Sequence, residues 1–335
     1  MSDTFFTAAP HWTWWIILYF FIGGMAGSAF FLASLLDWGR GQAPDTSGQS
    51  RVESRESRVG ELTSDRLTAR PIVRLGYYLA FIGVLISGFL LTIDLTRPLR
   101  FWHMLIENHT GRPMFKLWEP MSTGAWALLL FGLFSFLAAL AALAEDRPNI
   151  RLLQSAPVRF LRRRGPSLVI AVLGSVFGLF IAGYTGVLLA VTNRPVWADS
   201  HLLGLLFLVS GASSGASALV LLAVRRRVAE PGTVGWLVWF DCNVLRLELL
   251  VLIAFLISLG SVVRVYLSWW GVVLLLGVVG LGIVLPLLEE RRATHTPWQV
   301  ARTASLVLLG GFLLRMVVLL SSDQIHVIGA GVTGR

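Results

Sequence analysis

The sequence contains little cysteine and little charge. Cys242 is the only cysteine in 335 residues. One cysteine excludes an internal disulfide, an iron–sulfur cluster held by this chain alone and a four-cysteine zinc site. Charged residues make up 14% of the chain, whereas soluble domains carry roughly 25%. Because 55% of the residues are hydrophobic, the composition indicates an integral membrane protein.

The hydrophobic residues gather in eight runs, and each can cross about 30 Å of hydrocarbon with roughly 20 residues. The predicted fold is therefore all-α, a polytopic membrane protein with eight transmembrane helices. The expected spans are Trp12–Leu36, Pro71–Ile93, Met121–Ala144, Ser167–Val191, His201–Val224, Leu237–Val263, Trp269–Leu288 and Gln299–Ser321.

Lysine and arginine are distributed unequally between the connections. Of the 28 basic residues, nineteen lie in or next to the connections 37–70, 145–166, 225–236 and 289–298, and seven lie on the opposite side. The positive-inside rule places the first set in the cytoplasm and both termini outside. Segment 41–70 is polar and poor in large apolar residues, so we expect a mobile cytoplasmic insertion there.

No histidine falls in the middle of a predicted span, and five of the six lie on the predicted outer side. A membrane cytochrome b needs axial histidines paired across helices inside the bundle. We therefore expect no haem, although His11 and His201 could in principle ligate one near the outer surface. We also expect no metal bound by this chain.

Tyr184 lies between glycines near the outer end of the fourth predicted span. A tyrosine at a helix end is often part of the interfacial aromatic belt. Alternatively, its phenol hydrogen-bonds the carbonyl of a ligand in a membrane pocket. Other polar or aromatic groups are expected at a similar depth, namely His11, Trp15, Asp94, Asn193 and His201. A quinone needs apolar surface, donors for its carbonyls and groups that exchange protons near neutral pH, so this set favours an outer quinone site.

The sixth predicted span contains three charged residues, Asp241, Arg246 and Glu248, and Arg315 lies within the eighth. Charge inside a membrane is costly, so we expect these groups to face the protein interior and to be paired. Arg246 should then have a partner on another helix. The set is either an ion-pair network that holds the helices together or a proton path from the cytoplasmic side.

Small residues four apart occur in two of the predicted spans. Gly23 and Gly27, and likewise Gly24 and Ser28, should let the first helix approach its neighbours closely. The same reasoning applies to Gly211, to Gly215 and to the serines between Ser210 and Ser217 in the fifth span.

Several motifs, in this order along eight predicted helices, resemble the polysulfide reductase membrane-subunit family, also called the NrfD-like family. They cover nearly the whole chain: His11-Trp12, Tyr19-Phe20-Phe21-Ile22-Gly23-Gly24, Asp94-Leu95-Thr96-Arg97-Pro98, Pro120-Met121-Ser122-Thr123-Gly124, Tyr184-Thr185-Gly186-Val187-Leu188-Leu189 and Gly310-Gly311 with Arg315.

The resemblance implies a haem-free anchor subunit made of two four-helix bundles, here 1–197 with the quinone site and 198–335. It implies menaquinone or ubiquinone as the ligand, held by Tyr184 and His11 with Asp94 nearby. Iron–sulfur clusters and molybdopterin would belong to partner subunits on the outer face of a bacterial cytoplasmic membrane.

The leading functional hypothesis is a quinone-reactive electron-transfer subunit of a respiratory oxidoreductase, which does not itself act on the terminal substrate. Tyr184 and His11 would hold the quinone carbonyls, and His11 or Asp94 would take up protons. The alternative is a proton- or ion-translocating subunit without quinone chemistry, which would use Asp241, Arg246, Glu248 and Arg315.

Overall fold

A computed structural model describes residues 12, 14–39, 70–95, 97–107, 111–116, 118–192, 194–228, 231–290 and 296–322. In these ranges the protein is helical, with a single isolated bridge between Ile106 and Pro113 and no strand. The prediction of an all-α polytopic membrane protein is confirmed. Residues 41–69 of the predicted insertion 41–70 lie outside the described residues, and Arg70 begins α3.

Seven helical stretches are long and apolar enough to cross a membrane, and a bent pair makes an eighth. Six spans are single helices: α1 (Trp14–Gly39), α3 (Arg70–Asp94), α4 (Pro120–Asp146), α6 (Arg164–Ala190), α7 (Leu203–Arg225) and α11 (Pro297–Ser321). The seventh span runs through α9 (Trp269–Val272), the π-helix η5 (Val273–Val284) and α10 (Leu285–Glu290). Short helices η2 (Pro98–Met104), η3 (Arg151–Gln154) and α5 (Ala156–Leu161) lie in the connections.

The remaining span differs from its prediction at both ends. Helix α8 (Pro231–Ser258) begins before the predicted Leu237 and stops before the predicted Val263. After Ser258 the chain bends by 110° into the 3₁₀-helix η4 (Gly260–Leu267). Gly260 has φ +54°, a conformation that glycine adopts without steric cost, so a local backbone feature ends the span earlier than hydropathy indicates.

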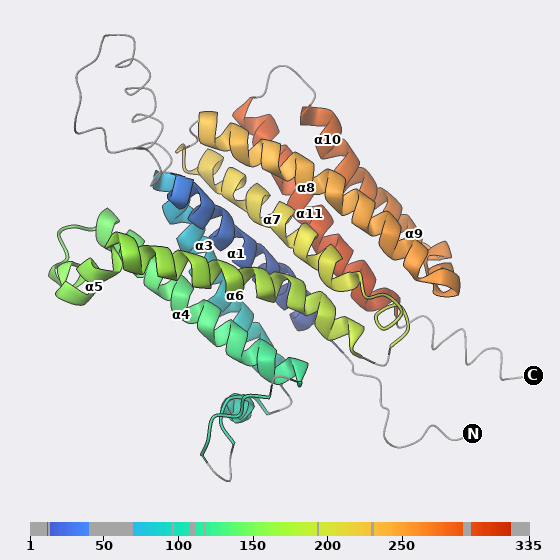
Figure 1. Cartoon of the computed structure of the whole chain (residues 1–335). Coiled ribbons are helices and arrows are strands. Elements are labelled where there is room, and N and C mark those ends of the chain that lie inside the picture. Colours follow the sequence, from blue (N-terminus) through green and yellow to red (C-terminus); the bar gives the residue numbers. More distant parts are fainter. Residues whose placement is uncertain are drawn as a thin grey trace, which may run out of the picture.

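Helix α1 occupies the centre of the molecule (Figure 1) and contacts α3, α6, α7 and α11. Small residues permit this: a Cβ added to Gly27 would lie 2.1 Å from the carbonyl oxygen of Gly178 in α6. A Cβ on Gly215 of α7 would lie 2.8 Å from the Cβ of Ser28 in α1. The predicted close packing at these small residues is confirmed.

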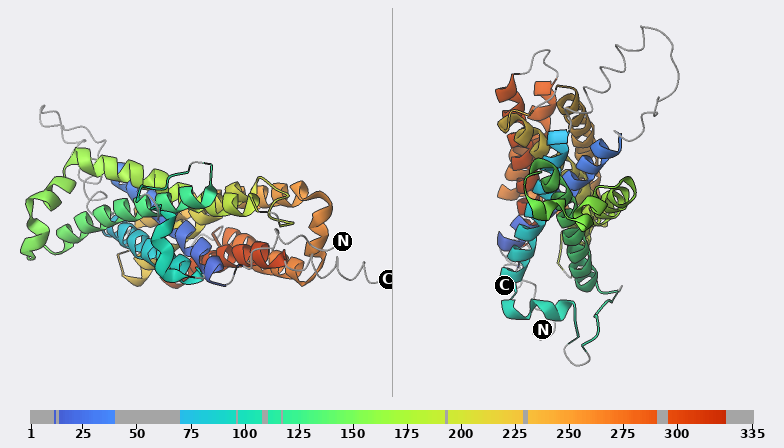
Figure 2. Two further views of the ribbon diagram at one scale, coloured as in Figure 1. Left: turned by 90° about the horizontal axis from the view of Figure 1, so that it is seen from below. Right: turned by 90° about the vertical axis from the view of Figure 1, so that its left-hand side faces the viewer.

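The helices associate in two sets. In the first set, α1 and α4 each contact both α3 and α6. In the second set, α7 contacts α8 and α11, and α11 contacts η5. Helices α1 and α6 both lie against α7, which joins the sets along a long seam (Figures 1 and 2). A division into two bundles at residue 197 stays a prediction.

Alternation of the spans puts the start of α1 and the end of α11 at the same end of the molecule (Figure 1). We call this the outer end, following the charge distribution, and the opposite end the inner end.

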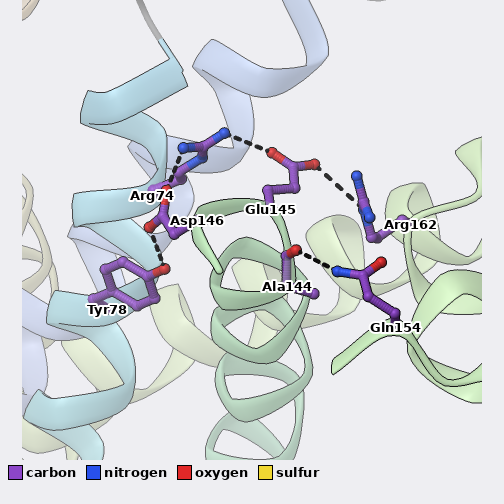
Figure 3. A network of polar contacts seen from close by, with 7 residues as sticks. All are labelled: Arg74, Tyr78, Ala144, Glu145, Asp146, Gln154 and Arg162. Atoms are coloured by element: carbon purple, nitrogen blue, oxygen red, sulfur yellow. Dashed lines mark hydrogen bonds and ion pairs between the residues drawn. The ribbon is translucent and has the colours of Figure 1, made fainter. Parts of the chain in front are cut away.

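Five residues form a polar network at the inner ends of α3 and α4, which we call the inner rim cluster (Figure 3). The guanidinium of Arg74 pairs with Asp146 and, at 3.0 Å, with Glu145. The Tyr78 hydroxyl donates to Asp146 Oδ2 at 2.6 Å. Arg162 Nε lies 3.7 Å from Glu145 Oε1. The cluster fastens α3 and the α5 connection to the end of α4.

Candidate functional site

Tyr184 lies on α6 near its outer end and points at the first turn of α4. Its hydroxyl donates a hydrogen bond to the carbonyl oxygen of Pro120 at 2.5 Å. The side chain is buried, and its ring stacks on Phe180 with centroids 5.5 Å apart. Tyr184 is therefore fixed in the contact between α4 and α6 and does not project freely into lipid.

A glycine in α4 makes room for this ring. A Cβ added to Gly124 would lie 2.3 Å from the phenol oxygen and from the carbon that bears it. Any larger residue at this position must displace the tyrosine. The position of Tyr184 therefore depends on Gly124 as well as on the hydrogen bond to Pro120.

The hydrogen bond to Pro120 determines what Tyr184 can still offer to a ligand. A phenol has one O–H to donate and an oxygen that can also accept. With the hydrogen directed at Pro120, the remaining capacity is to accept a hydrogen bond. In this geometry Tyr184 matches a hydroxyl group, as in a quinol, and must release Pro120 before it can donate to a quinone carbonyl.

The structure describes three of the other five outer residues predicted for the site. Asp94 is half-buried at the end of α3. Trp15 is 44% exposed, as an interfacial tryptophan would be, and His201 is exposed in the turn before α7. His11 and Asn193 lie outside the described residues. The roles of all five stay predictions.

Tyr19 is a residue that sequence reasoning missed. It is buried on α1 and is an electrostatic neighbour of the Tyr184 phenol. The sequence signal that could have identified Tyr19 was its place in the motif Tyr19-Phe20-Phe21-Ile22-Gly23-Gly24 of α1. Two phenols from different helices thus lie in the same region of the outer half.

The segment after α6 is tied to the outer ends of α1 and α11. Trp197 is almost fully buried, and its Nε1 donates to the Val318 carbonyl oxygen at 2.8 Å. Trp12 stacks on Trp197 with centroids 5.1 Å apart, and the Arg194 guanidinium lies 5.2 Å from the Trp197 ring centroid. Trp12 is therefore held against the 194–200 turn.

Asp241 is buried on α8, and its carboxylate accepts two hydrogen bonds from α7. Ser213 Oγ donates to Oδ1 at 2.5 Å, and Ser217 Oγ donates to Oδ2 at 2.6 Å. Asp241 also lines a pocket of about 320 Å³ between α7, α8, α10 and α11. The wall is largely apolar, and Glu289 and Arg302, which pair with each other, line it too.

Glu248 lies two helical turns further along the same face of α8 and is 3% exposed. Ser210 of α7 hydrogen-bonds its carboxylate, and Arg315 and Asp241 are its charged neighbours. The serines of α7 therefore serve as donors to buried carboxylates in addition to packing. The composition of α7 indicated small residues but did not indicate these partners.

Arg315 is fully buried in α11 and uses four of its five N–H donors. Nε donates to the Phe20 carbonyl of α1 at 3.2 Å, and Nη2 donates to the Phe207 carbonyl of α7 at 3.2 Å. Nη1 donates to Gly311 O and Ser210 Oγ. One guanidinium thus links three helices across the seam between the two sets.

Arg246 contradicts its prediction. It is exposed on the outward face of α8, and its Nη1 donates to Asn243 Oδ1 of the same helix at 3.0 Å. The sequence spacing correctly placed it away from Asp241 and Glu248, but the inference that it faces the interior of this protein was wrong. Within the part of the chain that the structure describes, no group of three or more His, Cys, Asp and Glu side chains could hold a metal ion.

Comparison with known proteins covers nearly the whole chain. The family model described as "Polysulphide reductase, NrfD" matches residues 4–327. The chain belongs to the NrfD family. A polysulfide reductase subunit of Wolinella succinogenes is 26% identical over 327 residues, which cover 92% of this chain and 93% of that protein. Protein NrfD of Escherichia coli is 27% identical over 333 residues, with 92% and 93% covered. The NrfD homologue of Haemophilus influenzae is 26% identical over 271 residues, with 76% and 83% covered.

Proposed function

We propose that this NrfD-family protein is the quinone-binding membrane subunit of a respiratory oxidoreductase. It exchanges electrons between the quinone pool and an iron–sulfur subunit docked at its outer end, and the molybdopterin centre belongs to a further catalytic subunit. The name of the Wolinella succinogenes relative, which is one of the chains of a polysulfide reductase, supports a role within a larger reductase. The proposed setting is a bacterial cytoplasmic membrane with both termini outside.

The observation that supports this proposal most strongly is the position of Tyr184. It is a buried phenol near the outer end, next to residues that face lipid: Phe180 is 40% and Val187 47% exposed on the same helix. A lipid-soluble ring can therefore approach from the membrane. The phenol oxygen can accept a hydrogen bond from a quinol hydroxyl while the phenol still donates its own hydrogen bond to the Pro120 carbonyl oxygen.

In this proposal, Asp94 and His11 exchange protons with the quinone. Oxidising a quinol releases two electrons and two protons, and reducing a quinone takes up the same number. The imidazole of His11 is a suitable proton acceptor near neutral pH, and the carboxylate of Asp94 at the end of α3 can pass protons on as a general base. Trp15, Asn193 and His201 complete the proposed outer rim of the site. The electrons pass to, or arrive from, the iron–sulfur partner.

Two variants test the proposal in the intact complex. Tyr184→Phe removes the hydroxyl and keeps the ring. We expect affinity for a fluorescent quinone analogue to fall about tenfold, the size of one lost hydrogen bond of about 1.4 kcal/mol, and quinol-driven reduction of the iron–sulfur clusters to slow. Unchanged binding and unchanged cluster reduction would contradict the proposal.

Gly124→Ala provides an independent test with a matched control on the same helix. The added methyl must displace the Tyr184 ring, whereas a Cβ on Gly132 meets only a Val84 methyl at 4.0 Å. We expect Gly124→Ala to lose quinol activity and Gly132→Ala to keep it, with both complexes assembled. Equal activities would mean that the position of Tyr184 does not matter for the reaction.

A second candidate function, proton transfer from the inner end, is favoured by the pocket beside Asp241. Asp241 lines the pocket and has two serine donors, and Glu248 has both Asp241 and Arg315 as charged neighbours, so buried polar groups follow one another from the pocket into the second helix set. In proteoliposomes, Asp241→Asn should then abolish proton movement and leave quinone-analogue binding intact. If proton movement persists in Asp241→Asn, this second candidate function is ruled out.

A further inference from the structure

Arg246 has a position that neither the proposed quinone site nor the inner pocket accounts for. Among the described residues, it is the charged side chain that is exposed deep within a span. The other charged residues of the spans are buried or lie within about two turns of a helix end. Helix α8 continues for twelve residues beyond Arg246, which is about 18 Å at 1.5 Å per residue.

The surroundings of Arg246 form a regular stripe along the outward face of α8. Its members recur at alternating spacings of four and three residues, and all are exposed: Trp239, Asn243, Arg246, Leu250, Ile253 and Ile257. Such spacing is that of the contact seam between two helices that cross at a shallow angle. Two polar side chains in the middle of this stripe are unsuited to hydrocarbon.

Within the stripe the polar groups are only partly satisfied. Asn243 Nδ2 donates to the Trp239 carbonyl at 2.8 Å, and Asn243 Oδ1 accepts from Arg246 Nη1 at 3.0 Å. A guanidinium has five donors, and no carboxylate of α8 can neutralise it, because Asp241 and Glu248 face the opposite side of the helix and are buried. A charge at such a depth is costly and is almost always paired.

We propose that the outward stripe of α8 binds a transmembrane helix of a different protein, which carries an aspartate or glutamate opposite Arg246. The choice of partner follows from charge. A second copy of this chain, related by a two-fold axis along the membrane normal, would bring Arg246 against Arg246 at the same depth, and like charges repel. A different protein with an acidic side chain at that depth satisfies the remaining guanidinium donors and buries the apolar ends of the stripe.

This interface is separate from the quinone site, since Tyr184 lies in the α4–α6 contact of the other helix set. The inference therefore does not depend on the proposed function. It adds a membrane-embedded partner to the partner proposed at the outer end.

The first experiment replaces Arg246. The complex is then isolated from membranes by an affinity tag on this chain. Arg246→Leu should lower the recovery of the co-purifying membrane protein at least tenfold, and Arg246→Glu should lower it further. Changing one acidic residue in the partner span to arginine should restore recovery with Arg246→Glu. The control, Arg225→Leu, removes an exposed arginine at the inner end of α7 and should recover the complex normally.

Thermal unfolding of the isolated subunit distinguishes an interface residue from a structural one. Arg246→Leu removes one exposed hydrogen bond to Asn243, so the unfolding midpoint should stay unchanged. A lowered midpoint would make Arg246 a residue that stabilises its own chain and would overturn the proposal.

A crosslink identifies the occupant directly. Ile253→Cys, combined with Cys242→Ser, is labelled with a benzophenone maleimide and irradiated in native membranes. A product with a different membrane protein that disappears in Arg246→Glu supports the proposal. A product of twice the mass of this chain would assign the stripe to a second copy. No product, together with normal recovery of Arg246→Leu, would mean that Arg246 reaches lipid headgroups, and either result overturns the proposal.

Discussion

The inner rim cluster and the buried groups of the second helix set use the same side-chain types in opposite surroundings. In the rim cluster, Arg74, Glu145 and Asp146 keep roughly a quarter to a third of their side-chain surface exposed. Asp241, Glu248 and Arg315 are at most 8% exposed. Water solvates the first group whether or not its pairs form, whereas the second group depends entirely on protein partners.

The comparison shows how each region is built. Exposed ion pairs contribute about 0–1 kcal/mol, so the rim cluster can be changed at small cost. Buried charges lose several kcal/mol of solvation each, and here serine hydroxyls and backbone carbonyls replace the water. Helix α7 supplies most of these groups, which explains why a helix with so many serines lies at the centre of an apolar protein.

The largest expected effect is at Arg315. Arg315→Met removes a guanidinium that binds groups of α1, α7 and α11 and leaves Glu248 without its cationic neighbour. We expect the free energy of unfolding to fall by about 3–5 kcal/mol, the usual cost of breaking a buried pair. Thermal unfolding of the purified subunit in detergent measures the loss. A loss of less than about 1 kcal/mol in the free energy of unfolding would mean that Arg315 contributes no more to stability than an exposed ion pair of the inner rim cluster.

A smaller effect is expected where helix backbones touch. Gly27→Ala places a methyl against the Gly178 carbonyl oxygen in the α1–α6 contact, and overpacking of this kind costs about 1–3 kcal/mol. Gly88→Ala on α3 is the matched control, because a Cβ there meets nothing within 4 Å. Its stability should stay at the wild-type value or rise slightly. If both variants are equally stable, the two helices can separate without loss.

The smallest effect is expected at the inner rim cluster. Arg74→Ala removes its contacts with Glu145 and Asp146, yet stability should fall by no more than about 1 kcal/mol. The difference from wild type should shrink as salt is added, since salt screens exposed pairs. A loss as large as that of Arg315→Met would remove the distinction between the two regions.

Hydropathy and charge predicted the number of spans, because hydrocarbon thickness fixes the length of a spanning helix. They did not predict where α8 ends, since Gly260 turns the chain while the sequence is still apolar. The site was harder to predict. A sequence shows that Tyr184 and Asp241 are unusual, but their partners, Pro120 and two serines of α7, come from helices distant in the sequence. The prediction for Arg246 was wrong because the spacing of residues along a helix does not show which face of that helix other helices cover.

The bend after α8 has a consequence for how the protein sits in its bilayer. A helix turned by 110° from the axis of α8 lies closer to the membrane plane than to the membrane normal when α8 itself spans the bilayer. Leu267 is 86% and Trp269 69% exposed beside it, and tryptophan prefers the headgroup level. Exposed apolar and tryptophan side chains at that level would resist movement of α8 along the membrane normal. A bilayer of different thickness would then be accommodated by tilt of the remaining spans, while Asp241 and Glu248 would keep their depth.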